Sequence, residues 1–265
     1  MHRAHNRSWP STRPCTCSMP CHRSRSDGAM ANSRSQGQAM VEFLIVIPVL
    51  ILLIFGMVQA ALIYTTKSGL NYATFQAARI GAVNHAQYED IRRGLIRGMY
   101  PMFSYSQKSA EERMELTVTE VDNHVLITRI SPSQDSFSAF QVEHADLLAD
   151  GESSLAIPND NLMYRAPQQN PVSIQDANLL KIRVQYCMKL IVPMVEHLLS
   201  SASSFNHRQV AGSFREVSQR TTDQYTAICQ ARRGFVVTSE ATVRMQSAAV
   251  NDDDSCGSGQ KMVCP

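Results

Sequence analysis

The sequence lacks the short motifs that mark common enzyme sites. It contains no G-x-S-x-G nucleophile turn, no H-E-x-x-H zinc motif and no glycine-rich phosphate loop. The eight histidines are scattered and show no pairing four residues apart. We therefore predict that the protein is not an enzyme, with no catalytic residues, no metal, no cofactor and no small-molecule substrate.

The chain also lacks a basic surface that would suit nucleic acid. Its formal net charge is +2, but the first 37 residues hold six arginines and a single acid, Asp27. The rest of the chain is mildly acidic, so we predict no nucleic-acid partner. Cys15, Cys17 and Cys21 lack a second pair of zinc ligands. Residues 252–254, three aspartates, fit a solvated loop better than a calcium site.

Charge is missing altogether from Phe43 to Val58, and residues 43–64 contain one polar side chain, Gln59. At about 1.5 Å per residue, such a helix spans the ~30 Å hydrocarbon core of a bilayer. Pro48 is predicted to kink this helix rather than to break it. Arginines precede the run and only Lys67 follows closely, which predicts a cytoplasmic N-terminus and an external body.

A carboxylate, Glu42, stands at the start of this apolar run. Gly37 precedes it by five residues and Phe43 follows it, a spacing that resembles the prepilin-type signal. Cleavage after Gly37 would make Gln38 the new N-terminus, and its amine could pair with Glu42 of a neighbouring subunit. An unpaired acid at such depth costs about 2.5 kcal/mol or more. The alternative is that Glu42 reaches up to the lipid headgroups.

A second helical pattern follows the apolar run. Leu70, Ala73, Ala77, Ile80 and Asn84 have helical spacing, so we expect the helix to continue as an amphipathic extension to about Gly94. The small residues of this stripe favour close approach of another helix. That helix could belong to another subunit or to the protein's own body.

The body is predicted to be α+β, a small antiparallel sheet with two or three helices. Alternation predicts a hairpin of strands 114–120 and 125–130, a strand over 181–190 and a closing strand over 234–246. In the strand over 181–190, the side chains expected to face inward are those of Ile182, Val184, Tyr186, Met188 and Leu190. Helices are expected at 193–202 and 214–230. Residues 131–175 are expected to form a loop with a short helix near 145–148.

Four cysteines follow the apolar run, an even number that suggests disulfides in an oxidising compartment. Three pairings are possible. We favour Cys187–Cys229 and Cys256–Cys264, with four free or buried thiols as the alternative.

The segments "GQAMVEFLIVIPVLILLIFGMVQ" and "AARIGAV" resemble the N-terminal region of TadE-like proteins, pseudopilins of the Flp (tight-adherence) pilus machinery. Body motifs at 157–165, 176–195 and 241–247 are also similar, so the resemblance covers about 36–247. It implies an inner-membrane protein with a periplasmic body that is cleaved by the prepilin peptidase. It further implies assembly with other pilins and pseudopilins of adhesive Flp pili. Gly37, Gln38, Glu42 and Phe43 would serve processing and assembly.

Two features depart from that family. The leader is longer than usual, so translation could begin at Met30, and the tail after Ser247 lies outside the resemblance. The expected organisation is a leader over 1–37, a membrane helix with its extension over 38–95, a periplasmic domain over 96–247 and a cysteine-bearing tail over 248–265.

Two other functions compete with this hypothesis. A signal peptidase could cut after Ala60, because Val58-Gln59-Ala60 has the small-residue character of such sites, and release a soluble periplasmic domain. A membrane-anchored enzyme with a site built from distant residues is the third hypothesis.

Overall fold

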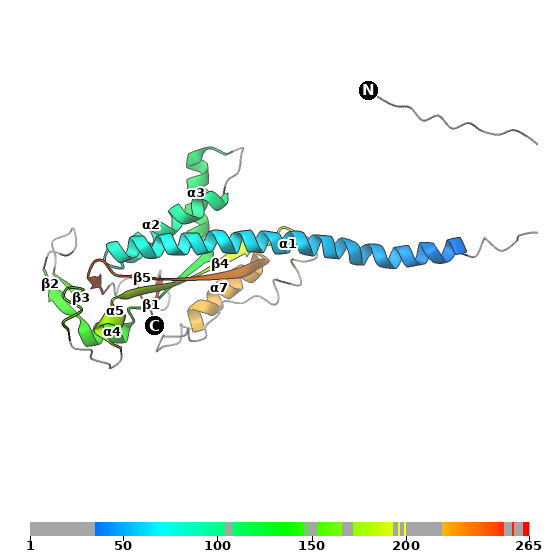
Figure 1. Ribbon diagram of the computed structural model, residues 1–265. Coiled ribbons are helices and arrows are strands. Elements are labelled where there is room, and N and C mark those ends of the chain that lie inside the picture. The colour runs from blue at the N-terminus through cyan, green and yellow to red at the C-terminus, as the bar shows by residue number, and fades with distance from the viewer. Residues whose placement is uncertain are drawn as a thin grey trace, which may run out of the picture. The chain divides into compact units, whose positions relative to one another are not determined.

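A computed structural model describes residues 35–103, 108–145, 147, 153–165, 172–192, 196, 199, 219–251, 256 and 262–264. The chain forms two compact units, Met1–Pro48 and Val49–Pro265. The first helix, α1 (Ser35–Val83; Figure 1), includes residues of both units. It includes one segment, Met40–Val83, that is long and apolar enough to cross a membrane.

The predicted continuous helix to Gly94 is wrong, because α1 ends at Val83 and α2 (Tyr88–Met99) begins after a turn. His85 and Ala86 in this turn have left-handed backbone angles, with φ of 57° and 59°. The chain near residue 246 stabilises the turn: the Gln246 amide donates to the Ala82 carbonyl and the Val250 amide to the His85 carbonyl. Long-range hydrogen bonds therefore end the helix, and the local pattern carried no sign of them.

The predicted strand at 114–120 is also wrong. These residues lie in α3 (Ala110–His124), whose N-terminus has a complete capping box between Ser109 and Glu112. Thr117 and Val121, four residues apart, form its buried face. The sequence alternates here, but the cap and the helical burial pattern stabilise a helix.

The main sheet confirms the three other strand predictions. Its order is β5-β4-β1-β7, formed by β5 (Gly234–Arg244), β4 (Leu179–Lys189), β1 (Val125–Ser131) and β7 (Met262–Val263). β4 is antiparallel to both β1 and β5, whereas β7 joins β1 in parallel. The tail predicted to be a loop thus contributes an edge strand to this sheet.

Residues 131–175 are more structured than predicted. They hold α4 (Gln134–Phe140), β2 (Val142–His144), β3 (Ser154–Ile157) and α5 (Ile174–Ala177). β2 and β3 form a small sheet with β6 (Ala249–Val250). A short helix occurs at α4. Near 145–148, where one was predicted, residues 145 and 147 are not helical, and 146 and 148 lie outside the described part of the chain.

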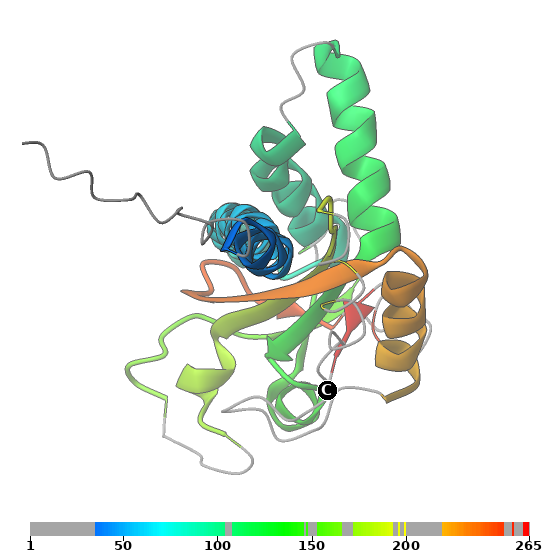
Figure 2. The ribbon, with the colours of Figure 1, turned by 90° about the vertical axis from the view of Figure 1, so that its right-hand side faces the viewer.

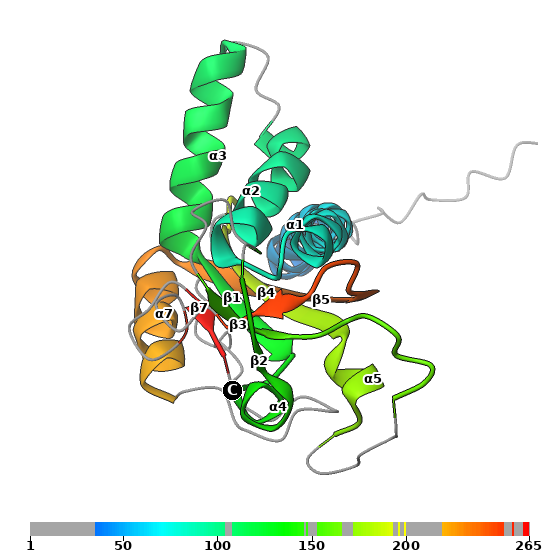
Figure 3. The same ribbon diagram turned by 90° about the vertical axis from the view of Figure 1, so that its left-hand side faces the viewer.

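The sheet separates two apolar cores. On one face, Ile182, Val184, Tyr186 and Met188 are buried in the larger core with α1 and α2. On the other face, Cys187 packs with Leu126, Cys229 and Val263. Figures 2 and 3 show α1 and α2 on one side of the sheet and α7 (Gln219–Ala231) on the other, next to β7.

The architecture is α+β, as predicted, with a long apolar N-terminal helix followed by antiparallel strands and several helices. The described body has more helices than the two or three expected. The 3₁₀ turn η1 (Tyr100–Phe103) and α2 to α5 precede α7. α7 agrees with the helix predicted over 214–230, and the one predicted over 193–202 lies largely outside the described residues.

Candidate assembly site

The residues predicted for processing and assembly lie at the start of α1. Gly37 and Gln38 have helical backbone, and the structure does not describe their side chains. Glu42 and Phe43 are exposed on the same helix, and 61 % of Phe43 is accessible. The helix continues through Pro48 without a break. This arrangement offers a carboxylate and an aromatic ring at the first turns of a long apolar surface.

The small-residue stripe packs inside the protein's own body. Leu70, Ala73 and Ala77 are fully buried. α2 crosses them through two glycines: a Cβ added at Gly98 would lie 2.5 Å from the Ala73 Cα, and one at Gly94 would lie 2.8 Å from the Ala77 Cα. Ile80, half-buried, also contacts Gly94. The stripe could have packed on another subunit or on the protein's own body. In the structure it packs on α2, a helix of the same chain.

Two polar side chains connect α1 to the sheet. The Lys67 ammonium donates to the Thr238 carbonyl of β5. The Gln59 side chain is 1 % exposed, and its Oε1 accepts a hydrogen bond of 3.2 Å from the Val192 amide, just after β4. The single polar residue of the apolar run is thus bonded to the body.

A groove of about 680 Å³ opens between α1, η1, α3 and the end of β4. Its walls are mostly apolar, and its charged groups are Glu120, Lys189, Glu196 and Arg232. The apolar lining includes Leu62, Met102, Phe103, Leu116, Leu190 and Ile191. Glu120 pairs with Arg232, and Glu196 pairs with Arg233, so three of these four charged groups already have partners.

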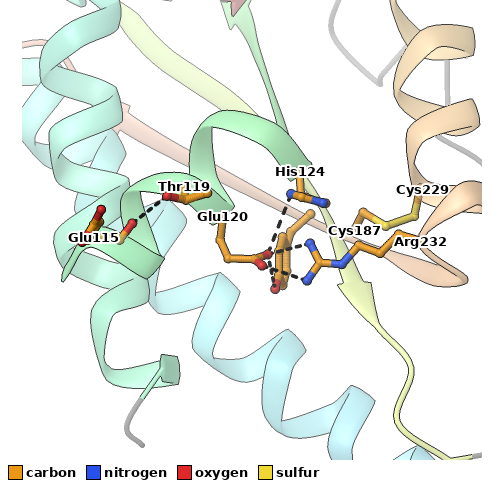
Figure 4. Close-up of polar contacts among 8 residues, drawn as sticks. Glu115, Thr119, Glu120, His124, Cys187, Cys229 and Arg232 are labelled. Atoms are coloured by element: carbon orange, nitrogen blue, oxygen red, sulfur yellow. Dashed lines mark hydrogen bonds and ion pairs between the residues drawn. A yellow bond between two sulfur atoms is a disulfide. The ribbon is translucent and has the colours of Figure 1, made fainter. Parts of the chain in front are cut away.

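The Glu120–Arg232 pair connects α3 to the end of α7 (Figure 4). The Arg232 guanidinium donates to both carboxylate oxygens of Glu120, at 2.7 and 2.9 Å. The Tyr186 hydroxyl donates to Glu120 at 3.4 Å, and His124 Nδ1 lies 4.0 Å from the same carboxylate. Burial and the nearby Arg232 charge lower the pKa of His124, against the opposite effect of Glu120. These contacts join α3, β4 and the end of α7 around Glu120, and we name the cluster of Glu120, His124, Tyr186 and Arg232 the clamp.

Next to this clamp, Cys187 and Cys229 form a disulfide that joins β4 to α7. A second disulfide joins Cys256 and Cys264 in the tail. These are the two pairs favoured from the sequence. Gly234 lies against the first: a Cβ there would meet the Cys187 Sγ at 2.2 Å and the Cys229 Sγ at 2.9 Å. Within the described residues, no group of three His, Cys, Asp or Glu side chains could hold a metal.

Sequence reasoning missed several of these contacts. The roles of Gln59, Glu120, Arg232 and Gly234 depend on residues far away in the chain. One signal was available: Gly94 and Gly98 form a small-x₃-small pair in "GLIRG", a spacing that favours close helix crossing.

The fold and these contacts define a class of protein: an α+β body carried by one helix capable of spanning a membrane. Residues 37–79 match the family model described as TadE-like protein. The match begins at Gly37 and includes Glu42 and the stripe from Leu70 to Ala77. No curated protein and no solved structure matches the chain.

Proposed function

We propose that this protein is a non-enzymatic pseudopilin or minor pilin that is needed to assemble Flp-type adhesive pili. One observation carries the proposal: the TadE-like match begins at Gly37, five residues before Glu42 and six before Phe43. The partners are the other pilins and pseudopilins of this system. The body motifs from 157 to 247 that resemble larger TadE-like proteins lie outside the match, and their part in assembly belongs to the proposal.

In this mechanism the prepilin peptidase cuts the leader after Gly37. The cut leaves the whole apolar run attached to the mature protein and creates an α-amine at Gln38. Glu42 is then the fifth residue of the mature chain. Its carboxylate pairs with the amine of a neighbouring subunit, which sets the register between adjacent helices and offsets the cost of an acid at the edge of the lipid.

The proposed location is the inner membrane, with the N-terminus in the cytoplasm and the body in the periplasm. The six arginines before residue 38, against Lys67 alone soon after the span, support this orientation. The disulfides Cys187–Cys229 and Cys256–Cys264 support an oxidising compartment for the body.

The competing release by cleavage after Ala60 is less well supported. Such a cut would detach Gln59, whose buried side chain bonds the Val192 amide of the body. A contact of this kind favours a mature protein that keeps its apolar helix.

The test is complementation of a strain that lacks its own copy of this gene. We expect Glu42→Ala to be processed and to reach the membrane, but to restore few or no surface pili. The control is Glu115→Ala, which removes an exposed carboxylate from α3 and should restore piliation. Normal piliation with Glu42→Ala would contradict the proposed pairing.

A further inference from the structure

The short segment Leu190–Val192, which we name the tip, follows β4 and lies against the apolar run of α1. The Val192 amide donates to Gln59 Oε1 at 3.2 Å. Leu190 and Ile191 also line the same groove as Leu62 of α1. The tip therefore lies beside α1 at the level of residues 59–62.

That level coincides with the expected edge of the hydrocarbon core. No charged residue occurs between Glu42 and Lys67. A core of about 30 Å takes about 20 helical residues, so a span that begins at Phe43 ends near Leu62. Gln59 thus falls in the last turn of the span, where a polar side chain needs a hydrogen-bond partner inside the protein. The Val192 amide is that partner.

The side chains around the tip suit a lipid interface. Leu190 and Val192 are buried, whereas Ile191 is 72 % exposed. Lys189, next to the tip, is exposed and can reach phosphate groups with its long side chain. Tyr64, on α1 just beyond Gln59, is 75 % exposed, and tyrosine is enriched where membranes meet water. An exposed isoleucine two residues from a lysine, in a segment bonded to α1 at Gln59, matches the apolar and polar layers of that interface.

We propose that the tip is a second membrane contact of this protein, with Ile191 inserted among the lipids of the outer face of the bilayer and Lys189 at the headgroups. The inference rests on the membrane span of the proposed function and not on the pilus role. Together with Gln59, this contact would fix the height of the body above the membrane.

The test uses the full chain in phosphatidylcholine–phosphatidylglycerol vesicles whose upper acyl chains carry bromine, a quencher of indole fluorescence. Trp9, the single tryptophan, is first replaced by Trp9→Phe. Ile191→Trp is then the probe. Tyr164→Trp is the matched control, because Tyr164 is 86 % exposed in a turn of the body. Leu53→Trp reports the span itself.

We expect brominated lipid to quench most of the fluorescence from position 191 and none from position 164. Equal quenching at these two positions would overturn the proposal. So would an indole at position 191 that is shielded from both brominated lipid and aqueous acrylamide, since a protein partner would then cover the tip. An absence of quenching at position 53 would show that α1 does not span the bilayer. The proposed function would then fail as well.

Discussion

At the scale of the residue, Gly234 is the position where a single methyl group has the largest expected effect. Its Cα faces both sulfurs of the Cys187–Cys229 disulfide, and the Met188 carbonyl lies 3.0 Å from the place of a Cβ. Any side chain there competes with the disulfide for space. The disulfide in turn closes a segment of 42 residues between β4 and α7.

We predict that Gly234→Ala prevents complete formation of this disulfide. Loss of such a bond costs about 2–4 kcal/mol of the free energy of unfolding. Thiol titration of the denatured protein should find free cysteine, and the melting temperature should fall as it does in the Cys187→Ser/Cys229→Ser double variant. A variant with no free thiol and an unchanged melting temperature would show that the site tolerates a Cβ.

A second prediction at this scale concerns pH and His124. Burial and Arg232 lower the pKa of His124 in the folded protein below its ordinary value of 6.5, so the unfolded chain binds its proton more readily. The free energy of unfolding should therefore fall as the pH drops below about 6.5 and rise again towards neutral pH. Denaturant titrations between pH 5 and 7.5, a range set by the ordinary histidine pKa, would measure this slope. His124→Gln should flatten it, and an unchanged slope would exclude His124 as its source.

At the scale of the element, the crossing of α1 and α2 depends on small residues. Gly98 lies so close to Ala73 that a Cβ would be 2.9 Å from the Ala73 Cβ as well as 2.5 Å from its Cα. These contacts involve backbone and short side chains, which cannot move aside as a long flexible side chain can. The two helices must shift apart to admit one more carbon.

We predict that Gly98→Ala lowers the free energy of unfolding by about 1–3 kcal/mol, the usual cost of overpacking. Alanine at an uncrowded helical position should instead be neutral or favourable, because it restricts the unfolded chain. Gly56→Ala is the matched control, since nothing lies within 4 Å of its added Cβ. Denaturant unfolding in detergent compares the two, and equal stability of both variants would argue against a tight crossing.

Some helices and strands could be predicted from the sequence, and others could not. The strands β4 and β5 were predicted because their sequences alternate, and Ile182, Val184 and Tyr186 of β4 are buried in the larger core as expected. α3 was missed because Met114, Leu116 and Val118 alternate, although the Ser109–Glu112 capping box was visible in the sequence. The end of α1 could not be predicted, because its turn depends on hydrogen bonds from residues near 246.

At the scale of the whole molecule, the sequence predicted the α+β class and the apolar helix, because both follow from composition and periodicity. The N-terminal pattern also predicted a resemblance to TadE-like proteins, and residues 37–79 match that family's model. What it could not predict is how the body attaches to the helix. Gln59 and Lys67 find their partners 133 and 171 residues away, and the stripe packs on the glycines of α2, through contacts that only the folded chain defines.

The central claim is that the mature protein begins at Gln38 and keeps α1 as its anchor. The most direct test is mass spectrometry of the N-terminus of protein taken from the membrane of a strain with an active prepilin peptidase. We expect a peptide that starts at Gln38, and we expect the uncut chain to accumulate when the peptidase is deleted. A mature terminus at Ala61, with the protein free in the periplasm, would contradict it.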